Sequence, residues 1–470
     1  CMIFVPLLTC TPLCIGLSRG IPIKLIHICG CNVTKLKYET QKFVEEELSN
    51  ISMPEMKGEE GRFQYTITDV KITELNLTHA DLRFIPDVGL LFDVQNSSIS
   101  LTFNRRILYW FFYDTGNINA SAEGVNINTA LNLIRDEEGR LKINNITCDA
   151  KISKMSAKFS GTLGRVYGFL ARFLTTGMRF LLNQKICPAL DHAALVLVNS
   201  LLETIPVRTE VDQFIGIDYS LISDPVVTSR SLDMHFRGMF FDLSHQNISL
   251  VNYAVEPVIK EYDRMVYLAL SEFFFDSGLF SYYTAGVFQM HIVNEKMPKD
   301  LEMLLRTTYF GFIMMLNPAL VDAPLSLQLA VNSPPKTSIK TSGATVVMTA
   351  IVNVMVLPPG QPPVQLSSMT MVHTHTHTQT FKIFSNQSAL ESLALIPLQA
   401  PLKTMLQMSV VPLINNWTKR GVRIPLADGM DFIEEVVEYH NVSVILPLDY
   451  LRSFRLFFIF MKIKHKIDFD

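Results

Sequence analysis

Two short motifs in the chain have residue types and a spacing that could support catalysis or metal binding. Gly16-Leu17-Ser18-Arg19-Gly20 matches the nucleophile elbow of serine hydrolases, but here it ends an apolar leader-like segment instead of joining a strand to a helix. His373, His375 and His377 alternate with threonine, so an extended strand would place them on one face, where they could bind a metal. Such a dipeptide repeat is more typical of a translated simple-sequence tract. We therefore predict no catalytic residue, no metal site and no cofactor.

A run of bulky side chains, Leu108-Tyr109-Trp110-Phe111-Phe112-Tyr113, indicates binding and contains one of the two tryptophans of the chain. In a fully buried strand both faces would be apolar, and the run would then belong to the core. At a strand end or loop tip, the same side chains would form an interfacial anchor, because Trp and Tyr favour the boundary between water and lipid. The residues alone leave both interpretations open.

Several features predict that the chain is secreted. Met2 to Leu17 is an apolar run too short for a membrane span, so residues 1–28 are interpreted as a signal-like leader. Outside the first 31 residues, Cys148 and Cys187 are the remaining cysteines and the natural disulfide pair, although two separate buried thiols are the alternative. Ten Asn-X-Ser/Thr sequons are spread along the chain, and those predicted to carry glycans are Asn76, Asn119, Asn145, Asn247 and Asn386.

The composition is more apolar than the hydrophobic cores of a soluble protein alone require. Of the 470 residues, 48% are hydrophobic and 18% are charged, and the formal net charge is −3. Such a chain fits a protein that buries apolar surface both in its cores and around an apolar ligand. The small net charge gives no reason to expect a nucleic-acid partner.

The elements that must position these residues follow a similar order in both halves. In the first half, a helix around Leu36–Leu48, alternating strands and a long helix over Lys154–Leu202 are predicted. In the second half, strands are expected over Ile215–Ser220, Leu232–Phe241, Met265–Leu270, Ala285–Ile292, Leu325–Val331 and Ala344–Val356, with helices over Lys299–Met315 and Ala389–Leu413. This order predicts a pseudo-duplicated, elongated α+β protein.

Long stretches of the sequence resemble the plasma lipid-transfer and lipopolysaccharide-binding protein family, which has the BPI-like fold. These stretches are Leu108–Gly124, Gly177–Pro188, Val211–Ser223, Arg264–Gly278 and Ser388–Gln407. The resemblance covers most of the span from about Cys31 to His440. Residues 372–380 and 441–470 depart from the family pattern, and we expect the final strand of the family to be absent after His440.

The resemblance implies a boomerang of two pseudo-symmetric barrels, each a twisted antiparallel sheet wrapped on a long helix, joined by a central sheet. The expected division is a leader over 1–28, an N-terminal lipid-binding barrel over 29–210, a central sheet and linker over 211–262, and a C-terminal lipid-binding barrel over 263–470. Each barrel would hold an apolar pocket for acyl chains that opens on the concave side.

The resemblance also implies roles for individual residues. It pairs Cys148 with Cys187, and it places the tip that contacts lipoproteins or membranes on Trp110, Phe111 and Phe112. From the expected elements, the residues predicted to line the lipid pockets are Met155, Phe159, Val166, Leu170, Phe173, Leu304, Tyr309 and Phe312.

These observations predict a secreted, extracellular protein that binds phospholipid acyl chains and moves intact phospholipids between lipoprotein particles or membrane surfaces. The phospholipid is cargo and no bond is broken, so a lipase is the least favoured interpretation. The alternative is a lipopolysaccharide-binding defence protein of the same family, which would use a basic N-terminal domain. Residues 31–214 contain 20 Lys and Arg against 22 Asp and Glu, and this balance argues against that role.

Overall fold

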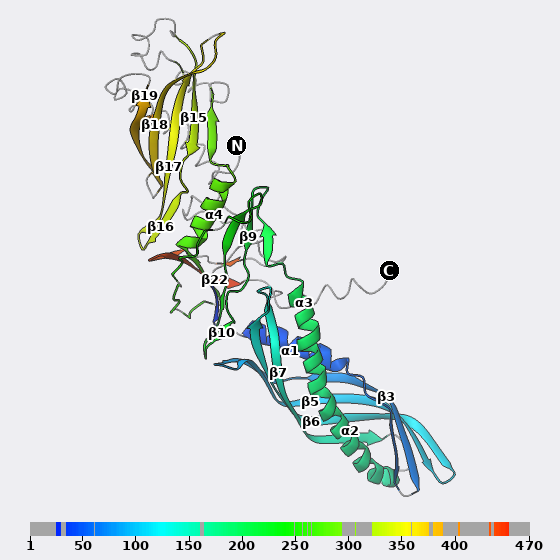
Figure 1. Ribbon diagram of the computed structural model, residues 1–470. Coiled ribbons are helices and arrows are strands. Elements are labelled where there is room, and N and C mark those ends of the chain that lie inside the picture. Colours follow the sequence, from blue (N-terminus) through cyan, green and yellow to red (C-terminus); the bar gives the residue numbers. More distant parts are fainter. Residues whose placement is uncertain are drawn as a thin grey trace.

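In the computed structural model, the chain forms an elongated molecule with one β-sheet near each end and further sheets between them (Figure 1). The structure describes residues 25–29, 34–60, 62–159, 164–248, 250–255, 257–260, 262–264, 266–293, 306, 322–358, 360–375, 379–388, 403–404, 432–433 and 437–450. Both ends combine an antiparallel sheet with helices, so the predicted α+β class is confirmed.

The N-terminal sheet is built from long antiparallel strands of up to 24 residues, along which inward and outward residues alternate with shifts of phase. Its order is β2-β3-β5-β6-β7, with β4 paired to β5. The strands are β2 (Met56–Glu60), β3 (Phe63–Asn76), β4 (His79–Ile85), β5 (Gly89–Tyr109), β6 (Phe112–Arg135) and β7 (Leu141–Phe159). Shifts of register interrupt several of the ladders, and such bulges bend and twist a sheet.

Two helical segments pack against this sheet. One is α1 (Thr34–Ser49), and the other is α2 (Gly164–His192), which continues through a π-helical turn, η2 (Ala193–Val198), into α3 (Asn199–Glu203). Figure 1 shows the second segment as one long helix running along the sheet. By length and composition, Leu174–Glu203 could also cross a membrane. Its apolar stripe instead packs into the core with side chains of the sheet: Leu174, Met178, Leu182, Ile186 and Leu190.

The central sheet brings together strands that are far apart in the sequence. Its order is β10-β11-β1-β13-β22-β20, with β21 paired to β22, and a smaller sheet has the order β12-β9-β8. The strands are β1 (Leu25–Cys29), β8 (Arg208–Glu210), β9 (Ile215–Asp218), β10 (Val226–Val227), β11 (Ser231–His235), β12 (Met239–Asp242), β13 (Val266–Ser271), β20 (Phe432–Ile433), β21 (Glu438–His440) and β22 (Ser443–Tyr450).

The C-terminal sheet repeats the combination of antiparallel strands and a helix. Its order is β14-β15-β17-β18-β19, with β16 paired to β17. The strands are β14 (Gln289–Ile292), β15 (Leu325–Val331), β16 (Lys336–Lys340), β17 (Gly343–Val356), β18 (Val364–His375) and β19 (Gln379–Ser388). Helix α4 (Glu272–Thr284) shares one apolar core with β16, β17 and the central strands β13 and β22.

The structure corrects three predicted elements. The long helix begins at Gly164 rather than at Lys154, because residues 154–159 continue the alternation of β7. Helix α4 was not predicted: it is buried on most sides, so it lacks the polar face that marks a helical period. A final strand was expected to be absent after His440, whereas Ser443–Tyr450 forms β22 and pairs with β13.

Two segments that the sequence set apart from the fold contain residues of observed strands. Residues 25–28, which the sequence assigned to a leader, lie in β1 between β11 and β13. Within the atypical segment 372–380, residues 372–375 belong to β18 and pair with β19. The helices predicted over 299–315 and 389–413 fall outside the described residues, apart from positions 306, 403 and 404. The domain division at residues 28, 210 and 262 stays a prediction.

Candidate functional site

The aromatic run forms the end of the hairpin between β5 and β6. Tyr109 pairs with Phe112, so Trp110 and Phe111 are the two residues of the turn. Trp110 is 56% exposed, Phe111 92% and Phe112 75%. Exposure of this degree excludes the buried-strand interpretation of the run and leaves a contiguous apolar tip facing solvent.

The tip is far from the centre of the molecule. At its other end, the 24-residue strand β6 reaches the central region, where the backbone N–H of Arg135 donates a hydrogen bond to Asp224 (2.7 Å). At about 3.3 Å per residue, such a strand is roughly 75 Å long when straight. The tip therefore lies at one end of the protein, where a partner can contact it without approaching the central sheets.

An ion pair between a buried arginine and a partly exposed aspartate lies at the base of this hairpin. Arg105 of β5 points to the inner side of the sheet, where its guanidinium lies over Gly116 of β6 and is 3% exposed. It donates to Asp114 through Nε (3.1 Å) and forms a second contact through Nη2 (3.0 Å). Both nitrogens contact the same oxygen, Oδ2 of Asp114, so the pair is charge-assisted at two points of the guanidinium. It joins β5 and β6 just below the exposed tip.

Behind the tip, the inner faces of β5 and β6 are apolar. Alternate positions along both strands are buried: Ile99, Leu101, Phe103, Ile118, Ala120 and Ala122. These side chains share one cluster with the buried stripe of α2 and with Val44 and Leu48 of α1. The N-terminal half therefore has a continuous apolar interior between sheet and helices.

The predicted pocket residues are only partly placed by the structure. Met155 lies in β7, is partly buried and packs against this cluster. Phe159 lies at the end of β7, and Val166, Leu170 and Phe173 lie in α2, but their side chains are outside the described part. Leu304, Tyr309 and Phe312 fall outside the described residues altogether. Their contact with lipid stays a prediction.

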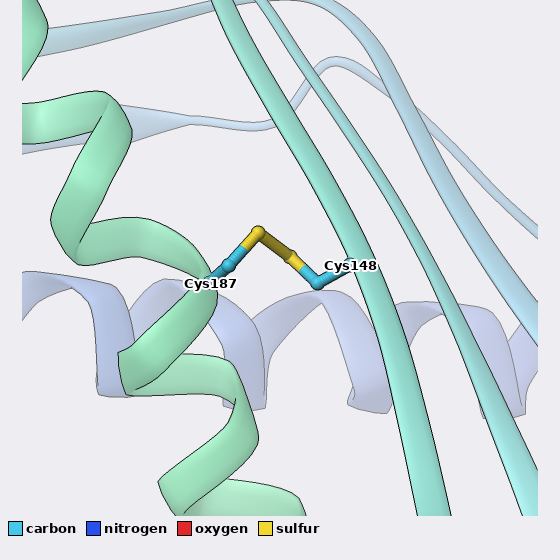
Figure 2. The surroundings of a disulfide bond; sticks show 2 residues. All are labelled: Cys148 and Cys187. Carbon is cyan, nitrogen blue, oxygen red and sulfur yellow. A yellow bond between two sulfur atoms is a disulfide. The ribbon is translucent and has the colours of Figure 1, made fainter.

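The long helix is fastened to the edge strand β7 by a disulfide and by polar side chains. Cys148 of β7 and Cys187 of α2 form the disulfide, with 5.6 Å between their Cα atoms (Figure 2). The amide of Asn199 accepts from the backbone N–H of Ile143 (2.8 Å) and donates to its carbonyl (2.9 Å). Asn183 accepts from the N–H of Ile152 (3.1 Å). These bonds satisfy backbone groups that an edge strand otherwise leaves open.

In the C-terminal half, carboxylates of α4 bind backbone N–H groups of the edge strand β16. The backbone N–H groups of Thr337 and Ile339 in β16 donate to Asp276 (2.5 Å) and Glu272 (2.6 Å) of α4. The hydroxyl of Tyr253 also donates to Asp276. Burial raises the pKa of the Asp276 carboxyl above its usual value, against the opposing effect of these hydrogen bonds. The contacts attach an edge strand to a helix and form no catalytic arrangement.

The motifs considered for chemistry are not assembled into a site within the described part of the chain. No group of three or more His, Cys, Asp or Glu that could hold a metal occurs there. His373 and His375 lie in β18 with undescribed side chains, whereas His377 and residues 16–20 fall outside the described residues.

Four of the five predicted glycosylation sites have exposed side chains, as a glycan requires: Asn76, Asn119, Asn145 and Asn247. Asn386 lies in β19, and its side chain is not among those described. Whether any of the five carries a glycan stays a prediction.

The order of the two halves matches a family with two named domains. The model of the N-terminal domain of the LBP / BPI / CETP family matches residues 33–205, and that of its C-terminal domain matches residues 209–449. This chain belongs to the LBP / BPI / CETP family. The C-terminal match includes most of β22, in agreement with the observed final strand.

Relatives named phospholipid transfer protein share half or more of their aligned residues with this chain. Phospholipid transfer protein from Homo sapiens is 54% identical over 439 residues, which cover 90% of this chain and 89% of the relative. The Mus musculus protein of the same name is 50% identical, with coverage of 92% and 91%. Lipopolysaccharide-binding protein from Homo sapiens is 27% identical, with 80% of each chain covered.

A solved structure supports the fold. The crystal structure of lipopolysaccharide binding protein aligns with a TM-score of 0.60 at 20% identity and covers 92% of this chain and 99% of that chain. At this identity the likeness concerns architecture alone. It agrees with the two-ended α+β arrangement and the sheets that link the two ends.

One residue at the tip was missed by the sequence interpretation. Arg62, in the turn between β2 and β3, places its guanidinium over the ring of Trp110. The two residues are 48 positions apart in the sequence, so no local pattern could have paired them. The two residues become neighbours because β3 pairs with β5, which brings the turn before β3 next to the turn after β5.

Proposed function

We propose that this protein is an extracellular carrier that takes up phospholipids by their acyl chains and moves them intact between lipoprotein particles or membrane surfaces. One observation carries the proposal: an exposed aromatic tip and an apolar interior occur together in a chain 54% identical to a protein named phospholipid transfer protein. The tip docks on the lipid surface, and the interior shelters the acyl chains.

The physical reason for such a carrier is the cost of exposing acyl chains to water. Transfer costs about 0.8 kcal/mol per CH₂ group, so one chain of about 16 carbons meets a cost of roughly 10 kcal/mol or more. Apolar side chains replace the lipid environment and remove most of this cost without any bond chemistry. The proposal therefore assigns no catalytic residue and treats the lipid as cargo.

The contact with lipid is proposed at two places. Trp110, Phe111 and Phe112 meet the surface of the particle, because their exposed rings suit the lipid–water boundary. Met155, Phe159, Val166, Leu170 and Phe173 would line the N-terminal pocket, and Leu304, Tyr309 and Phe312 the C-terminal one. Secretion and glycosylation at exposed sequons accompany this role.

The experiment follows fluorescent phosphatidylcholine from donor to acceptor vesicles in the presence of the secreted protein, with mass spectrometry of both lipid pools. Transfer of intact lipid, at a rate proportional to protein concentration, is expected. Folded protein that transfers no lipid but binds lipopolysaccharide would contradict the proposal and favour the defence function. Hydrolysis products in either pool would contradict it in favour of a lipase.

A further inference from the structure

Arg62 lies against Trp110 although the two residues belong to different hairpins. Phe63 at the start of β3 pairs with Tyr109 at the end of β5, so the turn before β3 and the turn after β5 are neighbours. The Cζ atom of Arg62 is 4.3 Å from the centroid of the Trp110 ring. This distance is within the range of a cation–π interaction. Two separate hairpins thus contribute to one exposed tip.

Trp110 is covered in part by two neighbouring side chains, whereas Phe111 is almost fully exposed. The ring of Tyr109 stacks on Trp110 at 6.3 Å with an interplanar angle of 12°, and Arg62 covers part of the indole. Trp110 also has a φ of 53°, a backbone conformation that bulky residues rarely adopt and that the two-residue turn imposes here. Phe111 meets Trp110 edge-on and is 92% exposed. Phe111 is therefore the side chain best placed to enter an apolar layer first.

The position of Arg62 suits contact with a phosphate group. A guanidinium over an aromatic ring keeps N–H groups for other acceptors, and a planar guanidinium can donate two parallel hydrogen bonds to phosphate. When Phe111 enters the apolar layer, Trp110 reaches the polar boundary that tryptophan favours in membranes. The phosphates of phospholipid headgroups lie in that boundary, where they would be next to Arg62.

We propose that Arg62 is a specificity-determining residue of lipid docking, which holds Trp110 in place and donates hydrogen bonds to headgroup phosphates. The tip then binds a phosphate-bearing lipid surface more tightly than an equally apolar surface without phosphate. This inference rests on the proposed docking function of the tip and adds the headgroup chemistry that the tip recognises.

The test compares binding of the full chain to vesicles of phosphatidylcholine and to vesicles of digalactosyldiacylglycerol, an uncharged lipid without phosphate. Arg62→Gln is expected to weaken binding to phosphatidylcholine vesicles about two- to ten-fold, the range of one hydrogen bond, and to weaken binding to the galactolipid less, because there only the contact with Trp110 is lost. Arg62→Lys should fall between wild type and Arg62→Gln. The matched control is Arg106→Gln, which removes the same charge from an exposed position of β5 and should change neither.

Fluorescence gives a second readout that a general loss of stability would not produce. The chain has two tryptophans, so subtracting the spectrum of Trp110→Phe isolates the emission of Trp110. Arg62→Gln should make Trp110 more accessible to acrylamide and reduce the blue shift on vesicle binding.

Equal weakening on both lipids, or no change on either, overturns the inference about Arg62, while wild-type lipid transfer would leave the proposed function standing. If the wild-type protein binds neither vesicle and transfers no lipid, the proposed function fails as well.

Discussion

Phe111 and Trp110 are adjacent in the sequence but have different surroundings at the tip. Phe111 is almost fully exposed, whereas Trp110 contacts Tyr109 and Arg62. The aromatic run could be recognised from the sequence, but its location in a two-residue turn could not. That turn requires a positive φ at Trp110, which the intrinsic preference of tryptophan does not predict. Residue types thus indicated the chemistry of the tip, and strand pairing determined its exposure.

Replacing Phe111 with alanine is expected to weaken docking on phospholipid vesicles about ten- to a hundred-fold, because burial of a phenylalanine side chain contributes roughly 1.5–3 kcal/mol. Trp110→Ala should also weaken docking. Vesicle flotation gives the affinity, and lipid that co-elutes with the protein on gel filtration gives its capacity to hold cargo. That capacity should not change.

The matched control for this prediction is Phe180→Ala, which removes an exposed phenylalanine from α2, away from the turn. It should leave docking unchanged. Equal loss of docking and of bound lipid in Phe111→Ala would instead mean that the tip supports the fold of the barrel.

At the scale of elements, the main feature of the N-terminal half is the long helix fastened to an edge strand. Its apolar period and the cysteine pairing were predicted from the sequence, but its beginning was not. Residues 154–159 are too few for a period of two to be distinguished from a helical period, so ladder pairing with β6 decides their conformation. Asn183 and Asn199 also gave no local signal, because their partners lie 31 and 56 residues away.

Replacing Cys148 and Cys187 together with serine should destabilise the N-terminal half. In the chain-entropy model, a link between residues 39 positions apart contributes about 3–4 kcal/mol by restricting the unfolded chain. Chemical denaturation, followed by far-UV circular dichroism, measures the change. Asn199→Ala is the comparison: it leaves two buried backbone groups of Ile143 without partners and should cost about 1–3 kcal/mol.

A change of less than about 1 kcal/mol for the double serine variant would contradict the prediction and would mean that hydrogen bonds and packing alone hold the helix to β7.

At the scale of the whole molecule, a small group of polar residues connects the N-terminal sheet with the central sheets. Leu221 donates its backbone N–H to Gly139, in the turn between β6 and β7 (2.8 Å), and Arg237 donates its backbone N–H to Ser220 (2.8 Å). Asp218, at the end of β9, is 2% exposed and accepts from the backbone and hydroxyl of Ser220. The sequence could not predict this joint, since each partner comes from a different element.

Asp218 also binds arginines from two further segments. Arg208 of β8 donates through Nε (2.9 Å), and Arg237 approaches at 3.5 Å. Burial alone would raise the pKa of Asp218, but the hydrogen bonds of Ser220 and Arg208 and the charge of Arg237 together lower it below 3.8. The charged carboxylate is therefore the form that binds Ser220 and the two arginines, next to the turn at Gly139.

Replacing Asp218 with asparagine should lower the free energy of unfolding by about 1–3 kcal/mol at neutral pH, since hydrogen bonds to a charged acceptor are weakened. The contribution of Asp218 to the free energy of unfolding is complete above pH 3.8, the pKa of this carboxyl in the unfolded chain, because Asp218 is then ionised in both the folded and the unfolded state. As the pH falls through the lowered folded pKa, the folded state must also be protonated and the contribution is lost. Denaturation of both proteins above and below pH 3.8 should show the difference shrinking in acid. A difference that stays constant with pH would mean that the shape of Asp218, and not its charge, stabilises its contacts with Ser220, Arg208 and Arg237.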